Sequence, residues 1–234
     1  MGPEVSVEFV DQGSAGGRGR VAASAARILR WSLVVAVWDR VRMSEVANVR
    51  AVADLVRAAE TGERIKYLMF WGHRPPSSGG VGAGCLSQWW PADFTVDGVV
   101  YRTAEHFMMS GKARLFGDEE TTAAIVAADH PKRAKDLGRR VRGFDDDVWA
   151  AARFDLVVRG NLAKFGQNDD LLDFLLGTGR RVLVEASPVD RVWGIGLAAD
   201  DERAEHPARW NGLNLLGFAL MEVRQTLIRN DQSV

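Results

Sequence analysis

Helical patterning is the feature that most limits how this chain can fold. Segments typical of capped, amphipathic helices cover most of the stretch from residue 103 to residue 229, and apolar runs typical of strands are short and few. Helices and strands do not alternate regularly, which disfavours a Rossmann-like sheet. We therefore predict a single domain with an α+β fold, predominantly helical with a few short strands.

Caps, breakers and apolar runs indicate where the individual elements lie. The expected helices cover residues 44–59, 103–116, 119–128, 132–137, 146–165, 169–176 and 214–229. The expected strands cover residues 67–71 and 181–185, together with a hairpin over 94–101 that turns at Asp97-Gly98.

Helix ends are predicted from single residues. Thr103, Asn168 and Asn214 are of the types that cap helix N-termini with their side chains. Gly177 is expected to end the helix that Asn168 begins. Gly217 is expected to allow close packing of the last helix.

Composition narrows the class of protein. The 234 residues include 30 basic and 31 acidic ones and a single cysteine, Cys85. These values exclude an internal disulfide or a cysteine-based zinc cluster and give no sign of a strongly basic nucleic-acid binder. No apolar run approaches the roughly 20 residues of a membrane helix, and the four histidines lack metal-ligand spacing. We expect a cytoplasmic protein that uses neither a membrane, a metal ion nor an organic cofactor.

Residues 1–42 differ from the rest of the chain. The stretch 11–20 is glycine-rich and typical of flexible segments. The apolar run 31–38 is short and is not followed by a small-residue cleavage site, which disfavours a secretory signal. We interpret 1–42 as a flexible or loosely packed extension and 43–234 as the folded domain.

The expected helix 103–116 carries two charges on an otherwise apolar side. Glu105 and Lys112 are seven residues apart, so they lie within about 20° of each other around the helix, and Met109 and Phe116 share that side. A side that mixes charges with large apolar groups is typical of a pocket lining. Another side forms the expected core stripe, made of Phe107, Met108, Gly111 and Leu115.

Each of these charges also has a structural interpretation. Glu105 in the first turn complements the helix dipole, which would lower its pKa and keep it ionised. A role as base or charge stabiliser would then suit it better than a role as acid. Lys112 could equally be an ordinary surface charge.

The loop 186–196 is dense in proline and glycine and follows an expected strand, so it is a shaped loop. It combines Asp190 with Trp193, an acid with a large flat ring that can stack on a heterocycle. The structural alternative is an aspartate that caps its own turn beside a tryptophan that covers the core. The candidate substrate-binding residues are Trp71, Gly72, Trp89, Trp90, Trp149 and Trp193.

Five segments in order resemble the YbiA-like, or NADAR, family. They are 85–91 (Cys-Leu-Ser-Gln-Trp-Trp-Pro), 97–98 (Asp-Gly), 101–106 (Tyr-Arg-Thr-Ala-Glu-His), 187–196 and 210–224. The chain departs from the family motif in having Gln88 where an Asn is usual, and Trp89-Trp90 where a Phe-Tyr pair is usual. Both changes fall on the expected pocket rim and bear on the substrate.

The resemblance implies hydrolysis of N-glycosidic bonds by the domain 43–234. It places the family's functional positions on Glu105, Trp149, Asp190 and Trp193, with Lys112 matching a family lysine. Cleavage of an N-glycoside passes through an oxocarbenium-like state that carboxylates stabilise. Glu105 and Asp190 are therefore the candidate catalytic carboxylates, and Lys112 would either bind phosphate or form a Schiff base with the opened sugar.

Three functions remain open at this point. The first is an N-glycosidase acting on ribosylated pyrimidine phosphate intermediates of early riboflavin biosynthesis, a small phosphorylated ribosyl substrate that suits the near-neutral charge of the chain. The second is a glycohydrolase that removes ADP-ribose from guanine in DNA or RNA. The third is a non-catalytic module for an ADP-ribose-like ligand, against which Glu105, Lys112 and Asp190 argue. An exposed surface of Arg133, Arg139, Arg140 and Arg142 would favour the second.

Overall fold

The computed structural model describes residues 49–62 and 64–231. This part of the chain contains α2 (Val52–Glu60), α3 (Ala104–Leu115), α4 (Glu119–Val126), α5 (Pro131–Gly138), α6 (Asp146–Gly166), α7 (Asp169–Gly177) and α8 (Leu215–Asp231). Its strands are β1 (Tyr67–Phe70), β2 (Phe94–Val96), β3 (Val99–Tyr101) and β4 (Val182–Glu185), and short 3-10 helices cover Ala83–Leu86 and Pro207–Arg209. The predicted α+β class, mostly helical with short strands, is confirmed.

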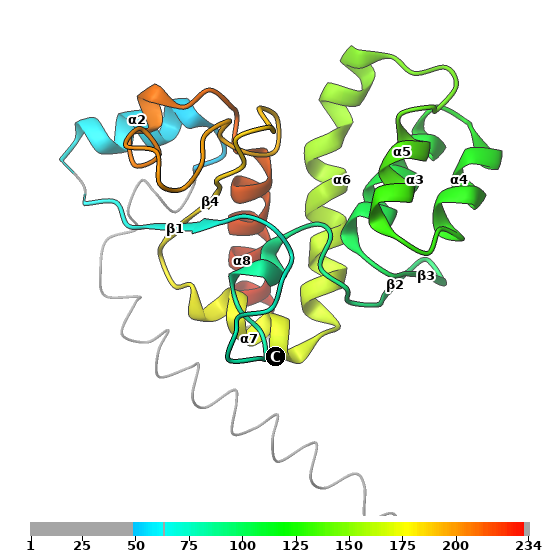
Figure 1. Ribbon diagram of the computed structural model, residues 1–234, viewed down its shortest axis with the longest axis horizontal. Helices are drawn as coiled ribbons and strands as arrows, with labels where there is room; N and C mark the ends of the chain where they lie inside the picture. Colours follow the sequence, from blue (N-terminus) through cyan, green and yellow to red (C-terminus); the bar gives the residue numbers. More distant parts are fainter. Residues whose placement is uncertain (1–48, 63, 232–234) are drawn as a thin grey trace, which may run out of the picture. The chain divides into compact units, whose positions relative to one another are not determined.

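Helix α6 stands between two groups of elements (Figure 1). On one side, α3 packs against α4, α5 and α6. On the other side, β1 pairs in parallel with β4, from Tyr67 opposite Val182 to Phe70 opposite Glu185, and α8 packs on β4 and on α6. The residues of the functional site come from both groups, so α6 sets their spacing.

The burial of β4 and the turn of the β2–β3 hairpin can both be explained by their sequences. Val182, Leu183 and Val184 are fully buried, which fits a strand covered on both faces. The predicted hairpin is confirmed: β2 and β3 pair antiparallel, and Asp97 and Gly98 have φ angles of 51° and 77°. Positive φ at both central positions is what a tight two-residue turn requires.

Helix α3 begins as the sequence predicts. The Thr103 hydroxyl accepts a hydrogen bond from the backbone N–H of His106 at 3.4 Å. The buried imidazole of His106 lies 2.8 Å from that hydroxyl and 3.2 Å from the carbonyl oxygen of Ala128, which ties α3 to the end of α4. The predicted core stripe is wrong at one end, because Leu115 in the last turn is 43% exposed.

Two predicted caps lack the side-chain hydrogen bond of a cap, because the side chains bind other backbone groups. Asn168 is the N-cap residue of α7, as predicted, but it donates from Nδ2 to the carbonyl oxygens of Asp93 and Lys164. Asn214 precedes α8 with a φ of 52°; its Oδ1 accepts from the N–H of Glu185 at 3.0 Å, and its Nδ2 donates to the Leu183 carbonyl at 2.9 Å. Asn214 thus fastens the start of α8 to β4.

Gly217 permits the predicted close packing of α8, and the element that it packs against is strand β4. A Cβ atom at this position would overlap the carbonyl oxygen of Leu183 and lie 2.5 Å from Nδ2 of Asn214. The backbone of α8 therefore lies directly on β4, next to the asparagine that joins the two elements.

In the described part of the chain the predicted first helix begins at Val52, and residues 44–48 of that prediction lie outside the described residues. The Asp54 carboxylate accepts from the N–H groups of Arg50 and Ala51, at 3.1 and 3.0 Å, and this closes the helix N-terminus at Ala51. The predicted extension 1–42 lies outside the described residues, and its boundary stays a prediction. None of the helices in the described part is long and apolar enough to cross a membrane.

Candidate active site

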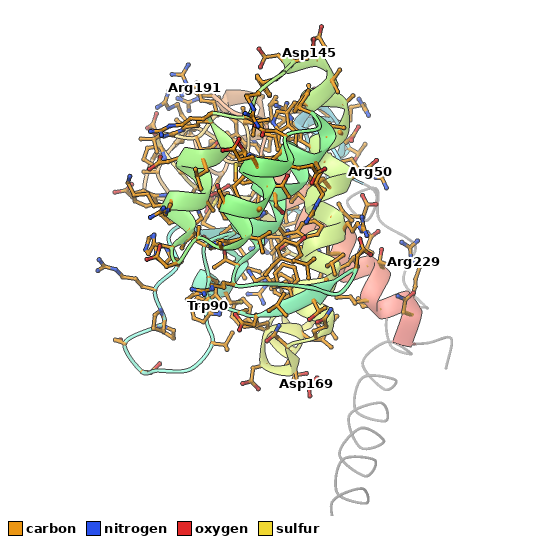
Figure 2. The ribbon with its side chains drawn as sticks, turned by 90° about the vertical axis from the view of Figure 1, so that its right-hand side faces the viewer. Arg50, Trp90, Asp145, Asp169, Arg191 and Arg229 are labelled. Atoms are coloured by element: carbon orange, nitrogen blue, oxygen red, sulfur yellow. The ribbon has the colours of Figure 1, made fainter. Side chains whose placement is uncertain are left out.

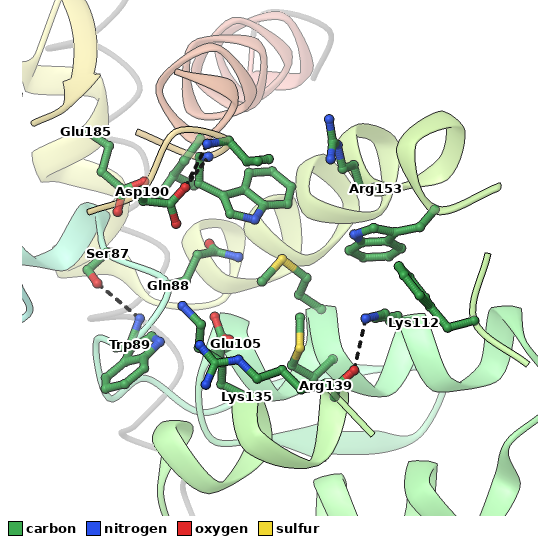
Figure 3. A pocket seen from close by; sticks show the side chains of 18 of the residues that line it. Ser87, Gln88, Trp89, Glu105, Lys112, Lys135, Arg139, Arg153, Glu185 and Asp190 are labelled. Carbon is green, nitrogen blue, oxygen red and sulfur yellow. Dashed lines mark hydrogen bonds between the residues drawn. The ribbon is translucent and has the colours of Figure 1, made fainter. Parts of the chain in front are cut away.

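A cavity of about 390 Å³ lies between the two groups of elements that flank α6 (Figure 3). From one side, α3 contributes Glu105 and Lys112, α5 contributes Lys135, and Arg139 follows directly after α5. The end of β4 and the loop after it contribute Glu185, Asp190 and Trp193 from the other side, and α6 contributes Trp149 and Arg153. No single segment could form this cavity alone.

Glu105 is buried at the carboxylate end of the cavity, which we define by Glu105, Glu185 and Asp190. Its side chain is 3% exposed, and its Oε1 has no hydrogen-bond partner in the described part of the chain. Burial raises the pKa of Glu105 to about 7, and the charge of Asp190 adds to this, although Lys135 and the Trp89 indole act in the opposite direction. The expectation that the helix dipole would lower this pKa is therefore wrong, because desolvation outweighs it.

Glu185 is a site residue that the sequence reasoning missed. It is the last residue of β4, and its Oε2 is buried and unpartnered among the described residues. Burial, followed by the charge of Asp190, raises the pKa of Glu185 to about 8. Its position at the carboxyl end of a strand, just before the Asp190 loop, was the signal present in the sequence.

Asp190 shapes its own loop and also lines the cavity. Its Oδ1 accepts hydrogen bonds from the backbone N–H groups of Val192 and Trp193, at 2.9 and 2.8 Å. Asp190 therefore caps its own turn, as the structural interpretation predicts. Its second carboxylate oxygen, Oδ2, makes neither of these bonds, so capping the turn does not prevent a role in the cavity. Figure 3 shows Asp190 beside Glu185 and above Gln88.

Lys112 lies at the opposite, aromatic end of the cavity, which we define by Lys112, Phe144 and Trp149 (Figure 3). Its Nζ donates to the carbonyl oxygen of Gly138 at 3.0 Å and stands 3.9 Å from the ring centroid of Phe144 and 5.7 Å from that of Trp149. Burial lowers the pKa of Lys112. It is therefore not a freely solvated surface charge.

The structure brings some of the predicted tryptophans to the cavity and leaves others outside it. Trp89, Trp149 and Trp193 line it. Trp71, Gly72 and Trp90 do not: Trp71 is 62% exposed, and Trp90 packs against the core. Figure 2 shows Trp90 well away from Arg191, the neighbour of Asp190.

Three cations in the lining were not predicted as site residues. Lys135 projects from α5, and Arg139 is the residue directly after α5. Arg153 projects from α6 with a buried Nε that has no partner in the described part of the chain. They make the cavity suitable for an anionic ligand. Among the described residues, no group of three or more His, Cys, Asp or Glu is arranged to hold a metal ion.

Buried carboxyl groups with raised pKa values that share a cavity with aromatic and cationic side chains are typical of an enzyme active site. The NADAR domain model matches residues 69–228, which is more than half of the chain. The chain therefore belongs to the NADAR domain family and is an enzyme of that family, as the resemblance implied.

Individual relatives agree with this assignment. An N-glycosidase of Acanthamoeba polyphaga mimivirus is 41% identical over 168 residues, which are 70% of this chain and 97% of that protein. A chloroplastic riboflavin biosynthesis protein of Zea mays is 32% identical over 141 residues, which are 56% of this chain but only 20% of that protein. The solved structure of the Escherichia coli protein YbiA superposes with a TM-score of 0.54 at 24% identity, over 76% of this chain and 96% of that one, which supports the fold alone.

Proposed function

We propose that this enzyme is an N-glycosidase that hydrolyses the N-glycosidic bond of ribosylated pyrimidine phosphate intermediates of early riboflavin biosynthesis. The observation that carries the proposal is the carboxylate end of the cavity, where Glu105 and Glu185 are buried beside Asp190 and burial raises their pKa values to about 7 and about 8. N-glycosidase names among the relatives support the reaction, and the maize riboflavin biosynthesis protein supports the substrate class.

In the proposed reaction, Glu105 gives its proton to the nitrogen of the leaving base as the C1′–N bond breaks. The bonding electron pair leaves with that nitrogen, and positive charge develops on the sugar. Asp190 stabilises this charge and directs a water molecule to C1′. The water oxygen bonds to C1′, and the carboxylates take up its proton.

The rest of the lining suits the other parts of such a substrate. The aromatic ring of Trp193 would stack on the base or the ribose near the carboxylates. Lys112, Lys135, Arg139 and Arg153 offer positive charge for a phosphate group.

An ADP-ribosylated nucleic acid is the less favoured substrate. The arginines that would form its basic surface are partly neutralised, since Arg139 contacts Asp136 at 3.3 Å and Arg142 contacts Asp118 at 2.7 Å and Glu120 at 3.1 Å. These ion pairs reduce the positive field that a polyanion would meet.

A product assay tests the proposed function. The purified protein is incubated in parallel with a ribosylaminopyrimidine phosphate and with ADP-ribosylated DNA. We expect ribose 5-phosphate to be released from the first and no ADP-ribose from the second. Release of ADP-ribose alone would replace this proposal with the nucleic-acid alternative.

Borohydride trapping tests the role of Lys112. We expect no reduced enzyme–sugar adduct during turnover, because Lys112 is held on Gly138 at the aromatic end, away from the carboxylate end where the sugar would react. In this interpretation, Lys112→Ala raises KM for the phosphorylated substrate and has less effect on kcat. An adduct detected by mass spectrometry and absent from Lys112→Ala would show that Lys112 attacks C1′.

A further inference from the structure

Gln88 occupies the centre of the carboxylate end of the cavity. It is 6% exposed and lies between Asp190 and Glu105 (Figure 3). Its backbone carbonyl accepts the N–H of Glu105 at 2.9 Å, so the loop that carries Gln88 is joined directly to the first turn of α3. Any ligand held by these carboxyl groups therefore meets the Gln88 side chain.

The orientation of the Gln88 amide is fixed by a chain of two hydrogen bonds. Asn161, fully buried on α6, donates from Nδ2 to the carbonyl oxygen of Val157 at 2.9 Å and to Oε1 of Gln88 at 2.9 Å. A carbonyl oxygen can only accept, so Val157 determines which end of the Asn161 amide faces it. Asn161 in turn determines that Gln88 turns Oε1 toward α6, and Nε2 remains as the free donor at the cavity among the described residues.

This donor differs in kind from the groups around it. The carboxyl groups of Glu105, Glu185 and Asp190 accept hydrogen bonds, and a glutamate can donate one only while it holds its proton. The Gln88 amide keeps its hydrogen atoms whatever the pH, so it suits a group that only accepts, and the ring carbonyl oxygens of an oxopyrimidine are such groups. The family motif usually has the shorter Asn at this position. The longer Gln88 side chain of the present chain therefore carries its amide donor further into the cavity.

We propose that Gln88 donates a hydrogen bond from Nε2 to a ring carbonyl oxygen of the leaving base, and that Asn161 positions it. This inference rests on the proposed function. As the C1′–N bond breaks and before the proton of Glu105 is fully transferred, the leaving nitrogen shares part of its electron density with the conjugated ring carbonyl. The hydrogen bond to that oxygen therefore becomes stronger in the transition state. Gln88 thereby selects oxopyrimidines and assists their departure.

The test compares Gln88→Met with the wild type, because Met keeps the length of the side chain and removes the amide. Two probes are titrated by calorimetry, free 5,6-diaminouracil for the base and ribose 5-phosphate for the sugar. We expect about tenfold weaker binding of the diaminouracil and unchanged binding of ribose 5-phosphate. Equal losses for both probes, or none, would overturn the role of Gln88. A wild type that binds neither probe would contradict the proposed function itself and this inference with it.

Gln167→Met is the matched control. Gln167 ends α6 outside the cavity lining, and both ends of its amide bind the backbone of Thr95 at 2.8 Å. The same substitution there should leave both affinities unchanged.

Asn161→Leu tests the positioning step. If Asn161 acts through Gln88, the Asn161→Leu substitution weakens diaminouracil binding in the wild-type background. The same substitution then causes no further loss in the Gln88→Met background. Additive losses would show that Asn161 does not act through Gln88, and they would overturn the positioning step.

Discussion

Glu105→Gln should fold normally and lose turnover by several orders of magnitude. The amide has the size of the carboxyl group but cannot transfer a proton to the leaving nitrogen, and general acid–base catalysis contributes about 10²- to 10⁴-fold by itself. The measurement is kcat on whichever substrate the wild type hydrolyses. Activity that survives the substitution on every substrate would refute the mechanism.

The pH dependence of stability provides the control for misfolding. Burial raises the pKa of Glu105 from 4.5 to about 7, so the native state holds a proton that the unfolded chain releases above pH 4.5. The stability that this proton contributes is fully present below pH 4.5 and is lost as the pH rises toward about 7. Glu105→Gln lacks this titration. Its melting temperature at pH 8 should therefore equal or exceed that of the wild type, and a lower value would indicate structural damage.

Gly217→Ala should destabilise the fold strongly, although it adds only one methyl group. The new Cβ would overlap the carbonyl oxygen of Leu183, a backbone atom that cannot turn aside, and crowd Nδ2 of Asn214. Overpacking of this kind costs about 1–3 kcal/mol, or more where the backbone has to move. The measurement is the free energy of unfolding from urea titration followed by circular dichroism.

Gly177→Ala is the matched control for Gly217→Ala. Gly177 is also a helical glycine, at the end of α7, and nothing lies within 4 Å of an added Cβ there. Alanine has the higher helix propensity, so this variant should be as stable as the wild type or slightly more stable. Equal effects at the two positions would show that α8 does not lie directly on β4.

The positions of many helices and turns along the chain could be predicted, because signals from neighbouring residues determine them. Thr103 as a cap and Asp97-Gly98 as a turn act over three or four residues, and the structure has both. The shared side of Glu105 and Lys112 likewise follows from helix geometry, and both residues line the cavity.

The features that could not be predicted depend on contacts between distant segments. The raised pKa of Glu105 reflects burial beneath elements that periodicity does not place, and Glu185 enters the site only because the Asp190 loop folds back beside it. Asn214 was expected to cap a helix, since nothing local indicates that its amide binds β4. Each of these features depends on contacts between segments that lie far apart in the sequence.

The hydrogen bonds inside the Asp190 loop have a consequence for how the site binds its ligand. With Oδ1 held by the N–H groups of Val192 and Trp193, the carboxylate cannot turn freely about its terminal torsion. The conformational entropy of orienting it is lost once, when the chain folds, and not again each time a ligand arrives. In the proposed mechanism the site is therefore preorganised: the hydrogen bonds of the loop fix the direction from which Asp190 stabilises the charge on the sugar.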